Sequence, residues 1–145
     1  MNANCIFCDI AAGRAPASLI HEVEIVTSFM ALHPSAPGEC LVIPRAHVDH
    51  FTDLDDATAQ RVMLVAQRIG RRMRTVFKPL RVGMMVHGFG MPHAHLIVVP
   101  QHSADQITSS RFARIENGAI VYDTRNVREP DRALLDGQAL LLRDS

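Results

Sequence analysis

Cysteine is scarce in this chain, with three residues in 145, too few for the disulfide framework of a small secreted domain. Charge of one sign is not in excess either, because lysine plus arginine and aspartate plus glutamate number 15 each. This balance excludes the basic surface of a typical nucleic-acid-binding protein and the polybasic segment of a membrane-surface protein. Long apolar runs are missing as well, and stretches such as residues 96–99 are far too short to span a bilayer.

The first ten residues contain no basic start followed by a long apolar run, so we expect no signal peptide. Together with the few cysteines, this predicts a cytoplasmic protein whose thiols stay reduced. There is no internal repeat, low-complexity tract or Gly/Ser linker. With 48% apolar and 21% charged residues, the composition is globular, and the length predicts one domain over residues 1–145.

The first half of the chain predicts strands followed by one long helix. Strand-forming residues occupy 19–22 and 25–32, with a hairpin turn within 21–24, and a short buried strand at 40–43 ends at Pro44. Thr52 or Asp53 is the expected N-cap of a helix that continues to about Phe77. Its buried stripe is predicted from helical spacing and comprises Val62, Ala66, Ile69, Met73, Val76 and Phe77.

Two further strands are predicted after the helix, at residues 81–86 and 92–99, with a tight Gly-Phe-Gly turn at 88–90 between them. The order of strands, one long helix and then more strands predicts an α+β fold, in which the helix covers an antiparallel sheet. A short strand at 119–122 and a helix from about Pro130 to Arg143 complete the prediction.

Histidine is the residue type that stands out, with eight in the chain. His93 and His95 are two positions apart, so on a strand both would share a face with Ile97. Two neighbouring imidazoles that enter a core need polar partners, and such a pair between two prolines favours a functional site over two structural histidines.

Three sequence blocks resemble a known family. Residues 93–99 read His-Ala-His-Leu-Ile-Val-Val, residues 37–47 read Pro-Gly-Glu-Cys-Leu-Val-Ile-Pro-Arg-Ala-His, and residues 5–10 read Cys-Ile-Phe-Cys-Asp-Ile. They are similar to the His-φ-His-φ-His-φ-φ motif (φ apolar), the Pro-Gly-His-x-Leu-Val-Ile-Pro-Lys-x-His motif and the start of zinc-bearing bacterial members of the histidine triad (HIT) family. The resemblance covers residues 5–101, and residues 102–145 form a C-terminal extension to which it assigns no role.

The resemblance implies the HIT-like α+β fold with a short N-terminal helix, and nucleotidyl transfer through a covalent intermediate. The middle histidine of the motif, His95, would attack the α-phosphorus of a purine nucleotide as phosphoramidase, hydrolase or nucleotidyltransferase. A neutral imidazole suits this role because it is both a nucleophile near pH 7 and a workable leaving group. Besides His95, the implied nucleotide and phosphate site contains His33, Gly88, Phe89, Gly90, Met91, His93 and Ile97. Members of the family are typically homodimers.

The chain departs from the family pattern at several site positions. Ile97 replaces the third histidine and cannot donate a hydrogen bond to phosphate, a loss of about 3 kcal/mol for one such donor. His102 is an alternative source of the missing imidazole, and His87 beside the turn is a further candidate ligand contact. Ala31 stands where the family has an aspartate that can hold ribose, while Glu39 replaces the histidine that follows Pro-Gly.

Cys5 and Cys8 have the Cys-x-x-Cys spacing that can hold one metal ion as thiolates. A redox dithiol is the alternative, but it expects a strand-to-helix setting rather than the extreme N-terminus. In zinc-bearing relatives the other two ligands are the histidine that ends the Leu-Val-Ile-Pro block and the first triad histidine, here His47 and His93. The resemblance therefore implies a closed, structural Zn²⁺ site, with His50 as the competing ligand and unligated or oxidised cysteines as the alternative state.

Three functions remain open from the sequence. The first is an enzyme with His95 as nucleophile and a nucleotide substrate. The second is a degenerate relative that binds nucleotides without efficient turnover, because of Ile97 and Ala31. The third is a zinc-stabilised interaction protein in which both strand histidines serve only the metal and the core.

Overall fold

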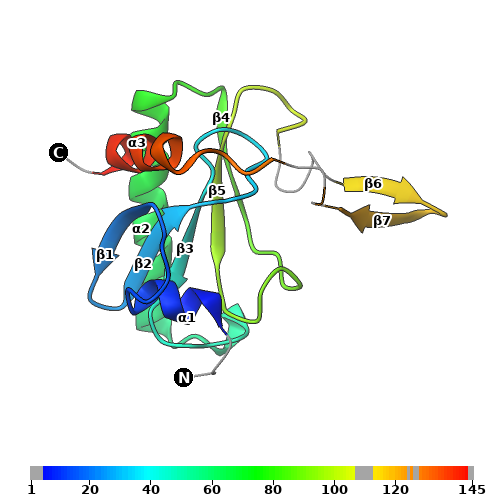
Figure 1. Ribbon diagram of the computed structural model, residues 1–145. Coiled ribbons are helices and arrows are strands. Elements are labelled where there is room, and N and C mark those ends of the chain that lie inside the picture. Colours follow the sequence, from blue (N-terminus) through cyan, green and yellow to red (C-terminus); the bar gives the residue numbers. More distant parts are fainter. Residues whose placement is uncertain (1–4, 107–112, 124, 126–127, 144–145) are drawn as a thin grey trace.

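The computed structural model describes residues 5–106, 113–123, 125 and 128–143 of the chain. Five strands form one antiparallel sheet in the spatial order β1-β2-β3-β5-β4 (Figure 1). The strands are β1 (Leu19–Val23), β2 (Val26–Met30), β3 (Cys40–Pro44), β4 (Arg81–Met85) and β5 (Leu96–Gln101). This is the α+β architecture that the sequence predicts, and β1 and β4 are the two edge strands.

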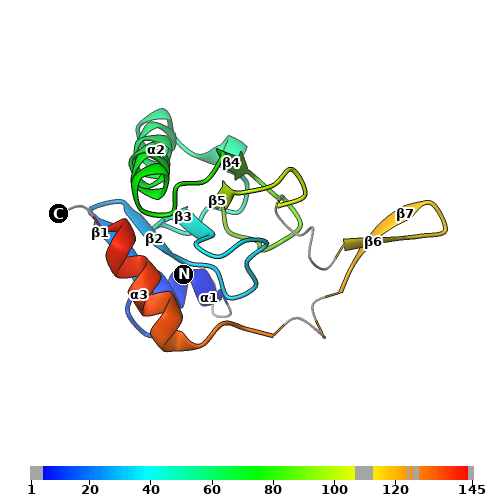
Figure 2. The same cartoon turned by 90° about the horizontal axis from the view of Figure 1, so that it is seen from above.

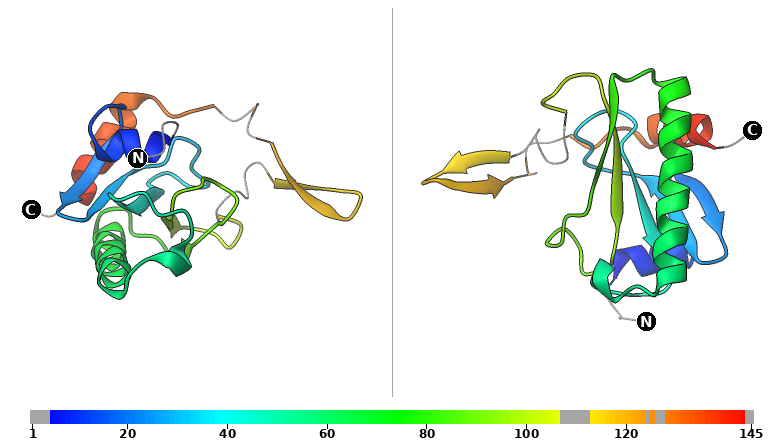
Figure 3. Two further views of the ribbon diagram at one scale, coloured as in Figure 1. Left: turned by 90° about the horizontal axis from the view of Figure 1, so that it is seen from below. Right: turned by 180° about the vertical axis from the view of Figure 1, so that it is seen from behind.

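The two faces of the sheet are covered by different helices. The long helix α2 (Asp56–Val76) runs along one face, and the short helix α1 (Ile6–Ala11) lies on the other (Figures 2 and 3). Alternation along the strands sorts the side chains accordingly: Val42 and Val98 pack with α2, whereas Phe29 and Ile43 pack with α1.

Helix α2 buries the stripe that helical spacing predicts. Val62, Ala66, Ile69 and Met73 are buried against the sheet, and the partly buried Val76 and Phe77 pack against the same cluster. The start of the helix differs from the prediction, because Thr52 and Asp53 lie in a separate 3₁₀ turn, η1 (Phe51–Asp53). Asp55 is the N-cap instead, since its carboxylate accepts a hydrogen bond from the backbone N–H of Thr58.

Two strand boundaries also differ from the prediction. The β1–β2 turn lies at residues 24–25, so His21 belongs to β1. Strand β5 begins at Leu96, and both His93 and His95 precede it. The physical reason is that the backbone of this segment bonds elsewhere: the N–H of Ala94 donates to the carbonyl of Val48, in the loop after β3.

The C-terminal region adds a hairpin and a helix. Strands β6 (Ala113–Glu116) and β7 (Ala119–Tyr122) form a two-stranded sheet that projects from the body of the molecule (Figure 1). Helix α3 (Arg132–Leu142) then returns to pack on β1, β2 and α2, with Leu135, Ala139 and Leu142 buried. Within the described ranges, no helix combines the length and the apolarity needed to cross a bilayer.

Candidate functional site

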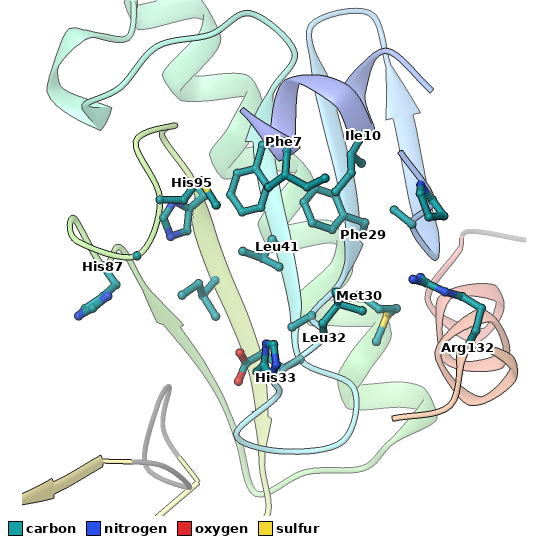
Figure 4. A pocket seen from close by; sticks show the side chains of 18 residues that line it. Phe7, Ile10, Phe29, Met30, Leu32, His33, Leu41, His87, His95 and Arg132 are labelled. Atoms are coloured by element: carbon teal, nitrogen blue, oxygen red, sulfur yellow. The ribbon is translucent and has the colours of Figure 1, made fainter. Parts of the chain in front are cut away.

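A cavity of about 340 Å³ opens on the face of the sheet that α1 covers only in part. Its volume falls within the usual range for small-molecule sites. The wall is mostly apolar because β2 and β3 direct Phe29 and Leu41 to this face (Figure 4). Ile97 of β5 pairs with Leu41 and also lines the cavity. Phe7 from α1 also lines the cavity, and its ring lies edge-on to those of Phe29 and His95.

His95 lines this cavity with one ring nitrogen already engaged. Its Nδ1 lies 2.8 Å from the carbonyl oxygen of His93, so Nδ1 carries the proton that it donates, and Nε2 is the nitrogen without a proton in the neutral tautomer. His95 is 7% exposed, so little of its surface is open to solvent. An unprotonated, oriented Nε2 is the form of imidazole that can act as a nucleophile.

The loop between β4 and β5 approaches His95 through a glycine. A Cβ at Gly90 would lie 3.4 Å from Nε2 of His95 and 3.5 Å from Nδ1 of His87. His87, Gly90 and Met91 all line the cavity. Gly88 lies beside a smaller neighbouring hollow, and Phe89 is fully exposed, so neither is part of the main wall.

Ile97 contributes an apolar surface beside the imidazole. It is 6% exposed and pairs in the sheet with Leu41 on one side and Met85 on the other. An isoleucine in this position offers no hydrogen bond to an anion bound at His95. His102, the alternative source of an imidazole, is exposed and does not line the cavity.

A buried carboxylate lies farther along the cavity wall. Glu39 is 4% exposed, and its Oε2 accepts hydrogen bonds from the backbone N–H and the hydroxyl of Ser35. The backbone carbonyl of Glu39 accepts a hydrogen bond from the N–H of Ala31. Ala31, which stands where the family has an aspartate, is therefore the direct neighbour of a residue with a carboxylate. His33 also lines the cavity and pairs with Glu129 at 3.3 Å. The family motif already marks Glu39 as a departure at a site position, but the sequence pattern assigned its carboxylate no role.

The four predicted metal ligands come together next to the cavity. Cys5, Cys8, His47 and His93 each offer one ligand atom, and these atoms lie within 4.8 Å of one another. His93 Nδ1 is 3.3 Å from Cys5 Sγ and 3.6 Å from Cys8 Sγ, and His47 Nδ1 is 3.3 Å from Cys8 Sγ. Tetrahedral zinc would place its ligand atoms roughly 3.3–3.8 Å apart, so the group could hold such an ion.

The other ring nitrogen of His93 supports this assignment. Nε2 lies 2.9 Å from the carbonyl of Pro44, which fixes the tautomer that leaves Nδ1 as the ligand atom. His93 is fully buried and points to the cysteines rather than into the main cavity. His50 is exposed and is not part of the group, so within the described residues it does not compete as a ligand.

Burial shifts the pKa values of two side chains in this group. Burial raises the pKa of the Cys8 thiol, and the neighbouring Cys5 raises it further. Burial lowers the pKa of His93 against the opposing effect of the hydrogen bond that its Nε2 donates to the Pro44 carbonyl, and the nearby His47 and His95 lower it further. Neutral imidazoles are ready ligands, while buried thiolates need the positive charge of an ion to form.

Comparison with known proteins identifies the family to which the sequence is similar. The HIT domain model matches residues 12–104, more than half of the chain. An uncharacterized HIT-like protein from Mycoplasma genitalium is 32% identical over 105 residues, which is 69% of this chain and 74% of that protein.

Two solved structures extend the likeness over nearly the whole chain. A HIT-like protein from Bartonella henselae superposes with a TM-score of 0.77 at 22% identity, covering 98% of this chain and 96% of the other. A zinc-bound histidine triad family protein from Mycobacterium smegmatis gives a TM-score of 0.73 at 29% identity, covering 97% and 91%. The fold, the paired histidines and the family model agree, and the chain belongs to the histidine triad (HIT) family.

Proposed function

We propose that the protein is a nucleotide phosphoramidase, hydrolase or nucleotidyltransferase that acts at the α-phosphate of a purine nucleotide, with His95 as nucleophile. The observation that carries this proposal is the orientation of one ring: Nδ1 of His95 is held by the His93 carbonyl, and Nε2 lies beside Gly90, which lines the cavity of about 340 Å³ together with His95. His95 is also separate from the Cys5, Cys8, His47 and His93 group, so its lone pair is available to substrate.

The proposed reaction has two steps. Nε2 of His95 attacks the α-phosphorus, a P–N bond of a phosphoramidate or a P–O bond of an ester or anhydride breaks, and an amine leaving group takes up a proton from solvent as it departs. Water then attacks the α-phosphorus of the nucleotidyl-histidine, the bond between Nε2 and phosphorus breaks, the proton lost by the water returns to solvent, and the ring is left neutral as the nucleotide is released. Splitting one difficult displacement in two is the advantage of covalent catalysis.

The loop beside His95 is the proposed phosphate subsite. Gly90 leaves room close to Nε2, and because its own N–H donates to the carbonyl of His87, the N–H of Met91 is the group that would stabilise charge that develops on the phosphate oxygens. Ile97 lowers the expected rate, because it adds no donor to this subsite. A family member that binds nucleotides with little turnover is therefore the second candidate function.

We further propose that Zn²⁺ occupies the group formed by Cys5, Cys8, His47 and His93, with a structural role. Four protein ligands leave no open coordination position for chemistry. The ion would tie α1 to the segment that carries both His93 and His95. Phe7, which covers His95 from α1, would then be held in place by the same ion.

We propose that the working unit is a homodimer in the cytoplasm, without nucleic-acid or membrane partners. An open sheet edge favours pairing with another chain, and β4 is such an edge. Met84 on β4 is 53% exposed, and Phe51 and Met63 beside it are 57% and 47% exposed. These side chains line a second apolar hollow of about 290 Å³, a surface suited to a second copy.

The test is incubation with adenosine 5′-phosphoramidate. Turnover that is lost in His95→Ala, together with a trapped nucleotidyl-protein in single-turnover experiments, is the expected result. Saturable nucleotide binding without product would favour the binding-only function. Turnover that survives in His95→Ala would exclude His95 as the nucleophile.

A further inference from the structure

An arginine from the C-terminal helix reaches the cavity from the side opposite His95. Arg132 is the first residue of α3 and lines the same cavity as His95. Figure 4 shows the two side chains at opposite ends, with Phe29 and Leu41 between them. Residue 132 lies outside the segment matched by the HIT domain model, which ends at 104.

The position of Arg132 is fixed by the packing of α3. Leu135 and Leu142 are buried in the main core, and the carbonyl of Leu141 accepts a hydrogen bond from Arg72 of α2. At the other side, both Nε and Nη2 of Arg143 donate to the carbonyl of Leu19. Helix α3 is thus tied to α2 and to β1, and the guanidinium is presented from a rigid element.

The guanidinium is also oriented by a buried serine. Ser18 is 2% exposed, and its hydroxyl donates to Asp136 Oδ1 at 2.6 Å. Because the single O–H is used in this way, the oxygen accepts from Arg132 Nη1 at 3.1 Å. Within the described part of the chain, Arg132 forms no ion pair with a carboxylate. A guanidinium carries five N–H donors, so most of them remain for a ligand.

We infer that Arg132 recognises the oxygen at C6 of a 6-oxopurine, and that the site prefers guanine or hypoxanthine nucleotides to adenine nucleotides. This inference rests on the proposed function, because it needs a nucleotide whose phosphate lies at His95. The apolar stretch with Phe29 and Leu41 then accepts the purine ring, and the base edge meets Arg132 at the far end.

The chemistry of the base edges explains the preference. Guanine and hypoxanthine present two acceptors, O6 and N7, which match two N–H groups of one guanidinium. Adenine presents an amino group at C6, so donor would face donor, and one contact would be lost. Good bidentate contacts of this kind discriminate by roughly tenfold or more.

Inosine and adenosine nucleotides are the matched probes, because they differ in their base only in the group at C6 and in the proton at N1. The measurement is kcat/KM for inosine and adenosine 5′-phosphoramidates, paired with the dissociation constants of the two monophosphates for His95→Ala. The expected inosine-to-adenosine preference is about tenfold or more in both assays. In Arg132→Met, the ratio should fall towards one.

Arg128→Met is the control, since Arg128 is exposed, pairs with Asp131 and does not line the cavity. The inosine-to-adenosine ratio of this variant should equal that of the wild type.

The outcomes separate this inference from the proposed function. If no compound turns over but inosine monophosphate binds more tightly through Arg132, catalysis fails and the inference stands. Turnover of both compounds with equal efficiency, or a ratio that Arg132→Met leaves unchanged, overturns the inference and leaves the proposed reaction intact. A ratio that Arg132→Met leaves unchanged would also be expected if Arg132 held a phosphate rather than a base. If neither monophosphate binds, the inference is overturned as well. Thermal unfolding of Arg132→Met checks that α3 remains docked.

Discussion

Gly90 and His95 are in such close contact that a single methyl group at Gly90 would stand 3.4 Å from Nε2 of His95. The same methyl group would lie 3.5 Å from the Nδ1 and the carbonyl oxygen of His87. A phosphorus atom attacked by Nε2 must occupy the space beside this nitrogen, about 3–3.5 Å away. The φ of Gly90 is not in the left-handed region, so backbone conformation does not require a glycine here. The absence of a side chain instead leaves space for the phosphate beside Nε2.

Gly90→Ala should lower kcat/KM for a nucleoside phosphoramidate by about 10- to 100-fold, because the added methyl group shifts either the phosphate or the ring. Steady-state kinetics and the thermal unfolding temperature are the measurements, and the unfolding temperature should hardly change. Gly88→Ala is the matched control, since a Cβ there meets nothing within 4 Å and its φ is not positive. Equal activity of the two variants would contradict the proposed phosphate position.

Ile97→His should raise turnover by about tenfold or more, because it places a hydrogen-bond donor beside the phosphate subsite. The side chain already lines the cavity, so the new imidazole would face the ligand rather than the core. Ile97→Val serves as the control: it removes one methylene, keeps the wall apolar and should leave kcat within about twofold. If the histidine variant folds and gains nothing in kcat, the low-activity explanation based on Ile97 is wrong.

Periodicity and motif spacing predicted those parts of the structure that depend on local physics. The buried stripe of α2 follows from helical geometry alone, because every third or fourth residue faces the sheet. The end of the helix at Val76 was also predictable, since Pro79 cannot continue it. The convergence of Cys5 and His93 came instead from family resemblance, because 88 residues separate them in the chain.

The parts that the sequence could not predict depend on contacts between distant segments. Strand β5 starts after His95 because Ala94 bonds to Val48, a partner that no local pattern identifies. Arg132 reaches the cavity because α3 docks on Ser18, which is 114 residues away along the chain. Glu39 lies within a recognised motif, but the motif does not predict where its side chain points. The turn that brings Ser35 into hydrogen-bonding distance of the Glu39 carboxylate holds this side chain at the cavity wall.

The number of reactive thiols should depend on whether the metal site is occupied. The zinc-loaded protein should show no thiol that reacts quickly with an aromatic disulfide reagent, and a strong chelator should expose two, Cys5 and Cys8. Cys40 should react only on unfolding, because it is fully buried and burial raises the pKa of its thiol well above its usual range.

Metal content provides the companion measurement. Cys5→Ser should contain well under one zinc per chain and should unfold at a lower temperature, because three ligands hold the ion less tightly than four. Cys40→Ala should retain the full zinc content. A wild-type protein purified without chelators that holds no zinc, or a Cys5→Ser variant with unchanged content, would overturn the proposed ligand set.

Asp55→Ala should lower the unfolding temperature by about 2–4 °C, because α2 loses its N-cap. Asp55 accepts hydrogen bonds from both the N–H and the hydroxyl of Thr58, and these bonds hold the pKa of the carboxyl below its ordinary value of 3.8. A carboxyl whose pKa is lowered by folding contributes fully above its unfolded pKa and loses that contribution as pH falls. The difference between the two proteins should therefore shrink below about pH 4. Asp56 is the first helical residue and not the N-cap, so Asp56→Ala should lower the unfolding temperature less.

Met84→Glu should convert the proposed dimer to a monomer, as measured by sedimentation at micromolar concentration. The side chain projects from edge strand β4 into an apolar surface with Phe51 and Met63, where a second copy would bury the new charge without a partner. Leu140→Glu is the control: Leu140 is 63% exposed on α3 and does not line that hollow, so this variant should remain dimeric. A monomeric wild-type protein would exclude the dimer, whereas a Met84→Glu variant that stays dimeric would move the interface away from β4. Comparing kcat/KM of the dimer and the monomeric variant would then show how far the site around His95 depends on the second copy.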